Sequence, residues 1–130
     1  MARKTEFIQV RKPGFESQLT ASKNIIRVGW KENVQDFLSI SHVNVFPSER
    51  EGLPVNLMES LAMGVPVITS SSRGCREVVR HELDGVILEY NNLSELIQAM
   101  EMLIEDKERL EKFSSAALEG RDRFSRKQLS

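Results

Sequence analysis

The sequence predicts an α/β fold in which a mainly parallel sheet carries helices on both faces. Short apolar runs of strand type alternate along the chain with segments whose apolar residues recur at helical spacing. Residues 43–69 show this pattern most clearly, because they read as strand, loop, helix and strand. Such a unit folds as two parallel strands joined by a crossover helix, and the crossover is almost always right-handed.

Apolar runs and stop residues set the boundaries within this unit. Val43–Phe46 and Val65–Thr69 are the two expected strands, the second of a fully buried type. The helix between them is expected to include Pro54 in its first turn, where a missing N–H costs nothing, and to stop at Gly64. Three apolar side chains at helical spacing give this helix a face to bury against the sheet: Leu57, Leu61 and Ala62.

The alternation continues on both sides of the central unit. Before it we expect a strand at 6–10, a turn at 11–14, a helix at 15–22, a strand at 25–28 ending at Gly29, and a short helix at 34–40. After it we expect a short helix at 76–81, a strand at 86–88, a helix at 93–105 capped by Asn92 or Ser94, and a charged helix at 107–123. Methionines at helical spacing are expected to fill the core: Met58, Met63, Met100 and Met102.

The loop before the central helix falls where α/β folds bind ligands. The carboxyl ends of parallel strands meet helix N-termini at one edge of the sheet, and Glu51, Gly52, Leu53 and Pro54 occupy that position. The helix start offers free N–H groups and a partial positive charge, which suits a diphosphate. Gly52 lets the backbone approach a ligand closely.

Two carboxylates flank this helix start, Glu51 on the loop and Glu59 on the helix, with seven residues between them. A carboxylate accepts hydrogen bonds from adjacent hydroxyls, as acidic residues do on the ribose of dinucleotides. One acid on the loop and one about two turns into the helix would hold two diols on either side of a diphosphate. The pattern therefore outlines a nucleotide-sugar site, although two acids at this spacing are weak evidence by themselves.

The residues around the two acids make the prediction specific. The run Pro-Ser-x-x-Glu-Gly-Leu-Pro starts at Pro47, and Leu-Met-Glu-Ser-Leu-Ala-Met-Gly-Val-Pro-Val-Ile starts at Leu57. The segments 73–79 and 84–88 continue the pattern. Together these runs resemble the donor-binding signature of group-one glycosyltransferases, and the resemblance covers roughly residues 5 to 125.

This resemblance implies a retaining enzyme of the two-domain GT-B architecture, with the chain matching its Rossmann-like C-terminal domain. Glu51 is the implied catalytic residue and contact for the sugar hydroxyls, and Glu59 the contact for the ribose. The implied donor-binding residues are Glu51, Gly52, Leu53, Pro54 and Glu59, with Trp30 or Lys31 beside the nucleotide base. The donor is a UDP-sugar or a GDP-sugar, with UDP slightly favoured. No cofactor or metal is expected, because the sequence has no Asp-x-Asp pair to hold a divalent ion.

The chain departs from the family pattern at both ends. Family members open this domain with a strand and a loop whose arginine and lysine neutralise the diphosphate, whereas residues 7–10 match the second strand. The acceptor-binding N-terminal domain and the final crossover helix have no counterpart either. Residues 1–130 are therefore expected to be a single, truncated donor-binding domain that is inactive alone.

The missing first strand leaves two arrangements open. In one, slightly favoured, the strand at 7–10 pairs directly with Val43–Phe46 and brings Arg11 or Lys12 towards the diphosphate. In the other, the sheet keeps an exposed edge, which would recruit an acceptor-domain polypeptide or a second copy of the chain.

Composition narrows the setting of the protein. A length of 130 residues fits one domain, and a net charge of −1 argues against nucleic-acid partners. The single cysteine, Cys75, rules out an internal disulfide and is expected to be a small buried or rim thiol. No apolar run approaches the ~18 residues of a membrane span, so a cytoplasmic location is expected. Peripheral membrane association would come through the missing domain.

The two histidines, His42 and His81, are assigned no catalytic role.

Two function classes stay open at this point. The first is a glycosyltransferase donor domain that works with a missing N-terminal half, for example in polysaccharide biosynthesis. The second is a non-catalytic module that binds nucleotide-sugars or regulates their use. A nucleotide-sugar epimerase of similar architecture is a weaker third, because its arrangement of acid and histidine is not found in this sequence.

Overall fold

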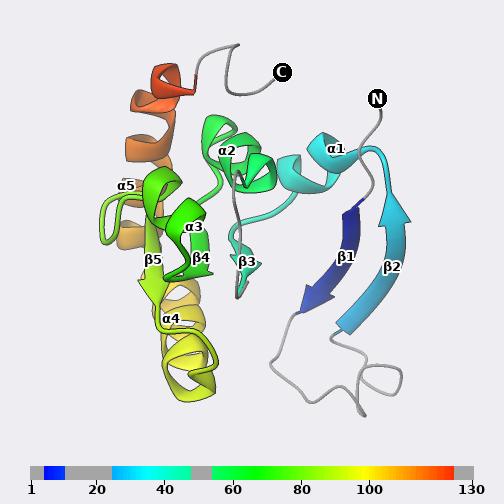
Figure 1. The fold of residues 1–130 in the computed structure, drawn as a ribbon, viewed down its shortest axis with the longest axis horizontal. Helices are drawn as coiled ribbons and strands as arrows, with labels where there is room; N and C mark the ends of the chain where they lie inside the picture. The colour runs from blue at the N-terminus through cyan, green and yellow to red at the C-terminus, as the bar shows by residue number, and fades with distance from the viewer. Residues whose placement is uncertain (1–4, 11–24, 48–53, 125–130) are drawn as a thin grey trace. The chain divides into compact units, whose positions relative to one another are not determined.

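The computed structural model shows an α/β protein and describes residues 5–10, 25–47 and 54–124 (Figure 1). The chain divides into two compact units, residues 1–37 and 38–130, which are described separately. The first unit carries an antiparallel pair of strands, and the second carries a parallel sheet with helices. The predicted α/β class is confirmed. Within the described ranges, no helix combines the length and the apolar character that a membrane span requires.

In the first unit, β1 (Thr5–Val10) pairs with β2 (Ile25–Lys31) in antiparallel register. The expectation that β2 would end at Gly29 is wrong, since the strand continues to Lys31. Phe7 pairs with Gly29 and Ile8 with Arg27, so Val28 is an extra residue at an irregularity of the ladder. A glycine inside a strand often marks such a bulge instead of ending the strand.

The favoured pairing of the N-terminal strand with Val43–Phe46 is also wrong. β1 takes β2 as its partner, and the two form a sheet of their own. Strands that follow one another in the chain commonly pair, and an antiparallel pair needs no crossover helix. The turn expected at 11–14 and the helix expected at 15–22 lie outside the described residues. The short helix expected at 34–40 is confirmed as α1 (Val34–Ser39).

The second unit contains the predicted strand–helix–strand pattern. β3 (Asn44–Phe46), β4 (Val67–Ser70) and β5 (Gly85–Leu88) form a parallel sheet in the order β3-β4-β5. The helix α2 (Val55–Ala62) connects β3 to β4, and α3 (Arg73–Val78) connects β4 to β5. β4 begins at Val67 and extends one residue beyond the predicted strand, to Ser70. The register sets Ile68 between Val45 and Val86.

Two longer helices follow the sheet. The predicted helix at 93–105 is confirmed as α4 (Leu93–Glu105), and its cap is Asn92, whose Oδ1 accepts a bond from Glu95 N. Asp106 caps the next helix in the same way through Arg109 N. The helix expected at 107–123 is shorter, because α5 (Lys107–Glu119) ends at Gly120 and a 3-10 helix, η2 (Arg121–Arg123), follows.

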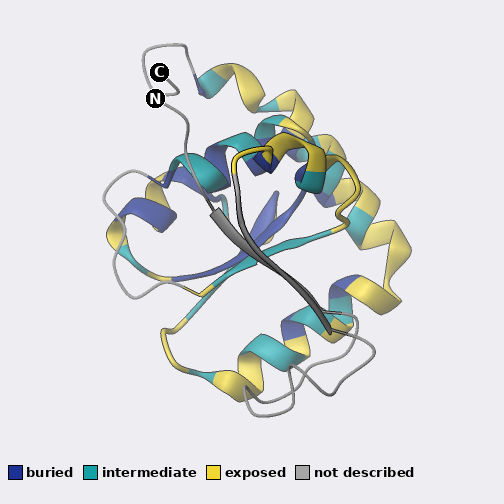
Figure 2. Ribbon diagram, turned by 90° about the vertical axis from the view of Figure 1, so that its right-hand side faces the viewer, coloured by how far each residue is buried: buried dark blue, intermediate teal, exposed yellow. Residues whose placement is uncertain are grey.

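Helices pack on both faces of the parallel sheet, as predicted, and bury the central strand β4 throughout, while β3 is intermediate in exposure (Figure 2). On one face the core is formed by α2, α3, the second half of α5 and Phe124, which follows η2. On the other face α4 and the first half of α5 pack against Ile68 and Val86. α5 therefore serves both cores, since Phe113 belongs to one and Ala117, about a turn later, belongs to the other. The fully buried side chains of the first core include Leu57, Leu61, Val67, Cys75 and Ala117.

The end of α2 depends on a glycine, as the sequence suggests. Gly64 has φ +78°, a left-handed conformation that other residues adopt only with strain. The Oγ of Ser60 donates a bond to Val65 O at 2.8 Å and closes the turn into β4. Met63, expected in the core, is 37% exposed, because it lies at the helix end and not on the buried face.

The helix α3 lies three residues earlier than the predicted 76–81. Val79 is already extended, and Arg80 N donates to Asp84 Oδ1 at 2.8 Å instead of continuing the helix. Asp84 is fully buried and its Oδ2 accepts bonds from Arg80 Nε at 2.8 Å and Arg123 Nη2 at 2.7 Å. We call these three residues the Asp84 network. It fixes the turn before β5 to the end of the chain's last described helix.

Candidate functional site

The carboxyl edge of the parallel sheet is the candidate site, as predicted. β3, β4 and β5 end there at Phe46, Ser70 and Leu88, because parallel strands end on the same side of a sheet. Two hydrogen bonds join neighbouring strands at this edge. Thr69 Oγ1 donates to Phe46 O at 2.7 Å, and Ser71 N donates to Leu88 O at 2.7 Å. These bonds satisfy the last carbonyls of the two outer strands and fix the edge.

The start of α2 supplies backbone donors at this edge. Pro54 is buried and is the N-cap residue, one position before the helix begins. Its carbonyl accepts bonds from Leu57 N at 3.0 Å and Met58 N at 3.2 Å. Helix geometry gives the N–H groups of Val55 and Asn56 no intrahelical partner. No side chain of the described residues caps this helix start, so its donors suit an anion.

Glu59 lies in the second turn of α2, closer to the helix start than the two turns expected. It is half-buried, while its neighbours Met58 and Ser60 are fully buried. The carboxylate therefore stands beside the buried face of the helix and not opposite to it. Asn56, one turn earlier, accepts a hydrogen bond at 2.8 Å from Asn44 Nδ2, which ties the first turn of α2 to β3.

Several predicted site residues lie beyond what the structure describes. Glu51, Gly52 and Leu53 are in the undescribed segment 48–53, so their roles stay predictions. Trp30 and Lys31 end β2, where they pair with Glu6 and Thr5, and belong to the first unit. Their base-binding role stays a prediction as well. Two predicted site residues are described at the carboxyl edge: Pro54 as the N-cap of α2 and Glu59 in its second turn.

Three contributors to this region were not found from the sequence. Thr69 and Ser71 fix the edge through bonds to strands far away in the chain. Ser72 follows them, and its Oγ is buried without a hydrogen-bond partner. The run Thr-Ser-Ser-Ser from Thr69 is the signal in the sequence that could have pointed to a hydroxyl-rich edge. His81 is exposed, and its Nδ1 accepts a bond from Ile87 N at 2.9 Å.

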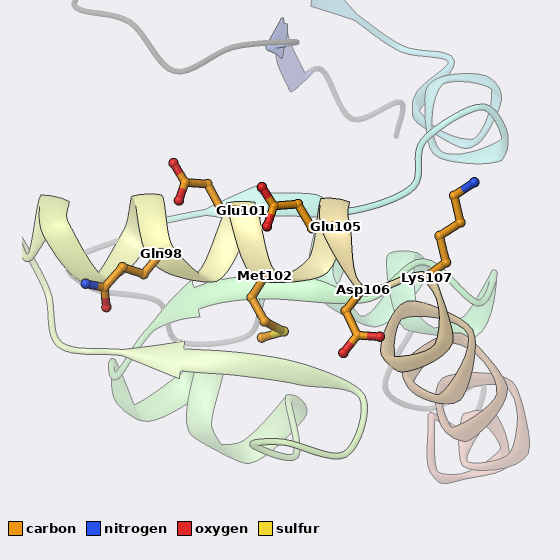
Figure 3. Close-up of a pocket in the computed structure, with 6 residues that line it drawn as sticks. All are labelled: Gln98, Glu101, Met102, Glu105, Asp106 and Lys107. Atoms are coloured by element: carbon orange, nitrogen blue, oxygen red, sulfur yellow. The ribbon is translucent and has the colours of Figure 1, made fainter.

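A surface pocket of about 570 Å³ lies elsewhere, on α4 and the start of α5 (Figure 3). Glu101 and Glu105 project from one side of α4 and Met102 from the other. Three carboxylates against one ammonium group make this pocket unfavourable for a diphosphate. Its lining residues are Gln98, Glu101, Met102, Glu105, Asp106 and Lys107. In the described part of the chain, His, Cys, Asp and Glu form no group of three that would suit a metal ion.

Comparison with known proteins identifies a family. The family model for glycosyl transferases, group 1, matches residues 16–120. A UDP-Gal:alpha-D-GlcNAc-diphosphoundecaprenol alpha-1,3-galactosyltransferase of Escherichia coli is 29% identical over 102 residues, which are 78% of this chain and 26% of the relative. An N,N'-diacetylbacillosaminyl-diphospho-undecaprenol alpha-1,3-N-acetylgalactosaminyltransferase of Campylobacter jejuni is 30% identical over 79 residues, which are 61% of this chain and 21% of that protein.

Solved structures share the fold. Anabaena Alr3699/HepE in complex with UDP and glucose has a TM-score of 0.76 at 18% identity, covering 82% of this chain and 29% of that chain. The C-terminal domain of a group 1 glycosyl transferase family protein, LpcC, from Francisella tularensis has a TM-score of 0.63 at 18% identity, covering 68% of this chain and 46% of that chain. The chain spans 26% and 21% of the two curated relatives described above.

Proposed function

This chain belongs to the glycosyl transferases of group 1, and from that membership we propose that it binds the nucleotide-sugar donor of a glycosyl transfer. The proposed donor is a UDP-sugar, and the proposed reaction moves a hexosyl group to a glycan, lipid or other acceptor with retention of the anomeric configuration. Support for UDP comes from the Anabaena structures with UDP and with UDP-glucose and from the UDP-Gal transferase of Escherichia coli. We also propose a part in polysaccharide biosynthesis.

One observation supports the proposal: the start of α2 lies at the carboxyl edge of the sheet, with Pro54 as its N-cap residue and Glu59 in its second turn. Diphosphate oxygens suit the N–H groups at the start of α2, and leaving-group charge that develops on them is stabilised there. The Glu59 carboxylate, about one turn further along, suits the ribose hydroxyls. We assign the sugar hydroxyls and the catalytic role to Glu51, at the other end of the seven-residue spacing.

We propose that the acceptor side of the reaction is supplied by another polypeptide segment. Catalysis of a two-substrate reaction requires an oriented nucleophile, and orientation contributes about 7–11 kcal/mol to lowering the barrier. The residues at the carboxyl edge account for donor recognition only. An acceptor-domain polypeptide, or a second copy of this chain, would complete the site, and any membrane association would come with that partner.

Isothermal titration calorimetry tests the donor proposal. UDP, GDP and ADP, and a sugar derivative of each, are titrated into the 130-residue chain. We expect saturable binding of UDP and of at least one UDP-sugar, with weaker binding of the guanine and adenine nucleotides. Absence of binding by all six ligands would contradict the proposed function, and preference for GDP would change the donor class.

The alternative, a non-catalytic binding or regulatory module, is less favoured because the relatives described above are named as transferases. Measuring whether glycosylated product forms distinguishes a donor domain from a binding module. A donor domain forms glycosylated product when an acceptor-domain polypeptide is added, and the stereochemistry of that product reports retention. A binding module binds UDP-sugar without turnover whichever partner is supplied.

A further inference from the structure

The hydroxyl of Ser72 lacks a hydrogen-bond partner although it is shielded from water. Its Oγ exposes less than 1 Å² of surface, and in the described chain no other buried side-chain nitrogen or oxygen is left without a partner. Ser72 precedes α3, yet its side chain accepts no bond from the N–H groups of that helix. A hydroxyl taken out of water without a new partner destabilises a fold. Such a group calls for a physical explanation.

The position of Ser72 in the fold explains why its hydroxyl has no partner among the described residues. It lies two residues after the end of β4, the central strand of the sheet, and therefore at the carboxyl edge. α2 and α3 pack on the same face of the sheet through a shared core that includes Leu57 and Cys75. Each of these helices follows a parallel strand, so both begin at that edge. Ser72 and the donor groups at the start of α2 consequently border the same end of the sheet.

We propose that Ser72 Oγ donates a hydrogen bond to a diphosphate oxygen of the bound donor, an inference that rests on the proposed function. The hydroxyl is a donor, and the diphosphate presents only acceptors. Rotation about the Cα–Cβ bond carries Oγ between staggered positions without moving the backbone. The ligand would thus provide the partner that the described protein groups do not. Thr69 and Ser71 fix the strands on either side, which holds the Ser72 backbone in place for this contact.

This role predicts opposite effects on stability and on binding. Ser72→Ala removes a hydroxyl that has no partner in the unliganded chain, so the folded state loses no hydrogen bond. The same substitution removes a bond to the charged ligand. A purely structural serine would behave differently, because its loss would lower stability and leave a similar ligand affinity.

The experiment measures thermal unfolding of the ligand-free 130-residue chain and calorimetric binding of UDP and UDP-glucose. Ser115, exposed on α5, provides the matched control as Ser115→Ala. We expect Ser72→Ala to keep or raise the unfolding temperature and to raise the Kd of both ligands about tenfold. Ser72→Cys, close in size but a weak donor, should raise the Kd similarly, and Ser115→Ala should leave it within about twofold.

Two results would overturn the inference while leaving the proposed function intact. One is wild-type affinity for UDP in both Ser72 variants. The other is a lowered unfolding temperature of Ser72→Ala with unchanged Kd, which would make the residue structural. If the wild-type chain binds neither UDP nor UDP-glucose, the proposed function fails first and this inference fails with it.

Discussion

Arg123 follows Asp84 by 39 residues in the chain, and its Nη2 donates a hydrogen bond to the Asp84 carboxylate at 2.7 Å. The carboxylate is fully buried and also pairs with Arg80. Arg123 Nη1 donates in addition to Val78 O at 2.8 Å, at the end of α3. Burial lowers the pKa of the Arg123 guanidinium below its ordinary value, while the charge of Asp84 opposes that change. The Asp84 network therefore joins α3, the start of β5 and η2.

Asp84→Asn is expected to destabilise the fold strongly. The substitution leaves two partly buried guanidinium groups without their counter-charge, and breaking a buried pair in this way costs about 3–5 kcal/mol. The free energy of unfolding, measured by urea titration at neutral pH, checks this. Glu77→Gln is the matched control, because Glu77 pairs with Arg73 on the surface and its loss should cost less than about 0.5 kcal/mol. Equal effects of the two variants would show that the network contributes little.

Local patterns in the sequence were enough to predict the central unit. Leu57 and Leu61 are four residues apart, so they lie on the same face of α2, and both are fully buried. The spacing of apolar residues therefore identified the helix and its buried face. Gly64 and Asn92 are residue types with a specific role at helix ends, and both occupy those positions. Glu59 was correctly placed on α2 for the same reason, since its position follows from counting residues after Pro54.

Features that depend on distant residues were not predicted. In the sequence, Asp84 is part of an Asp-Gly pair typical of a turn. No neighbouring residue in the sequence indicates that Arg123 is its partner. The same cause explains why α3 ends before the predicted residue 81, because Arg80 N bonds to Asp84 and does not continue the helix. The antiparallel pairing of β1 with β2 was missed because apolar runs identify strands without identifying their neighbours. Ser72 was missed because hydrogen-bond satisfaction is a property of the folded chain.

Gly64→Ala is expected to destabilise the protein by about 1 kcal/mol, because φ +78° is strained for a residue with a Cβ. The new Cβ would also lie 2.9 Å from Leu118 Cγ, but that side chain is 40% exposed and can move away. Urea unfolding of Gly64→Ala, Leu118→Ala and the double variant separates the two causes. If the contact with Leu118 is the main cause, the double variant recovers the loss; backbone strain predicts no recovery.

Donor binding is expected to be independent of divalent metal ions. The sequence has no Asp-x-Asp pair, and the N–H groups at the start of α2 provide positive potential for the diphosphate without an ion. Calorimetry with UDP in the presence of EDTA, and again with added Mg²⁺ or Mn²⁺, measures this directly. The Kd should agree within about twofold across these conditions. Loss of binding in EDTA and its recovery with one cation would establish a metal site.

The two acids of the motif are expected to differ in what they recognise. If Glu59 holds the ribose, Glu59→Ala weakens UDP and UDP-sugar alike, because both ligands carry the ribose. If Glu51 holds the sugar hydroxyls, Glu51→Ala weakens the UDP-sugar and leaves UDP unaffected. Each lost charge-assisted hydrogen bond costs about 1.5–3 kcal/mol, which is roughly a 10- to 150-fold rise in Kd.

Calorimetry of UDP and UDP-sugar binding to the Glu51→Ala and Glu59→Ala variants gives four Kd values. These values test whether the two acids recognise different parts of the donor. Glu119→Ala is the control, since Glu119 is an exposed acid at the end of α5 and its loss changes the net charge by the same amount. Its Kd values should match the wild type, which excludes a general effect of charge. Equal weakening of UDP by the Glu51 and Glu59 variants would contradict the assignment, because plain UDP has no sugar hydroxyl for Glu51 to hold.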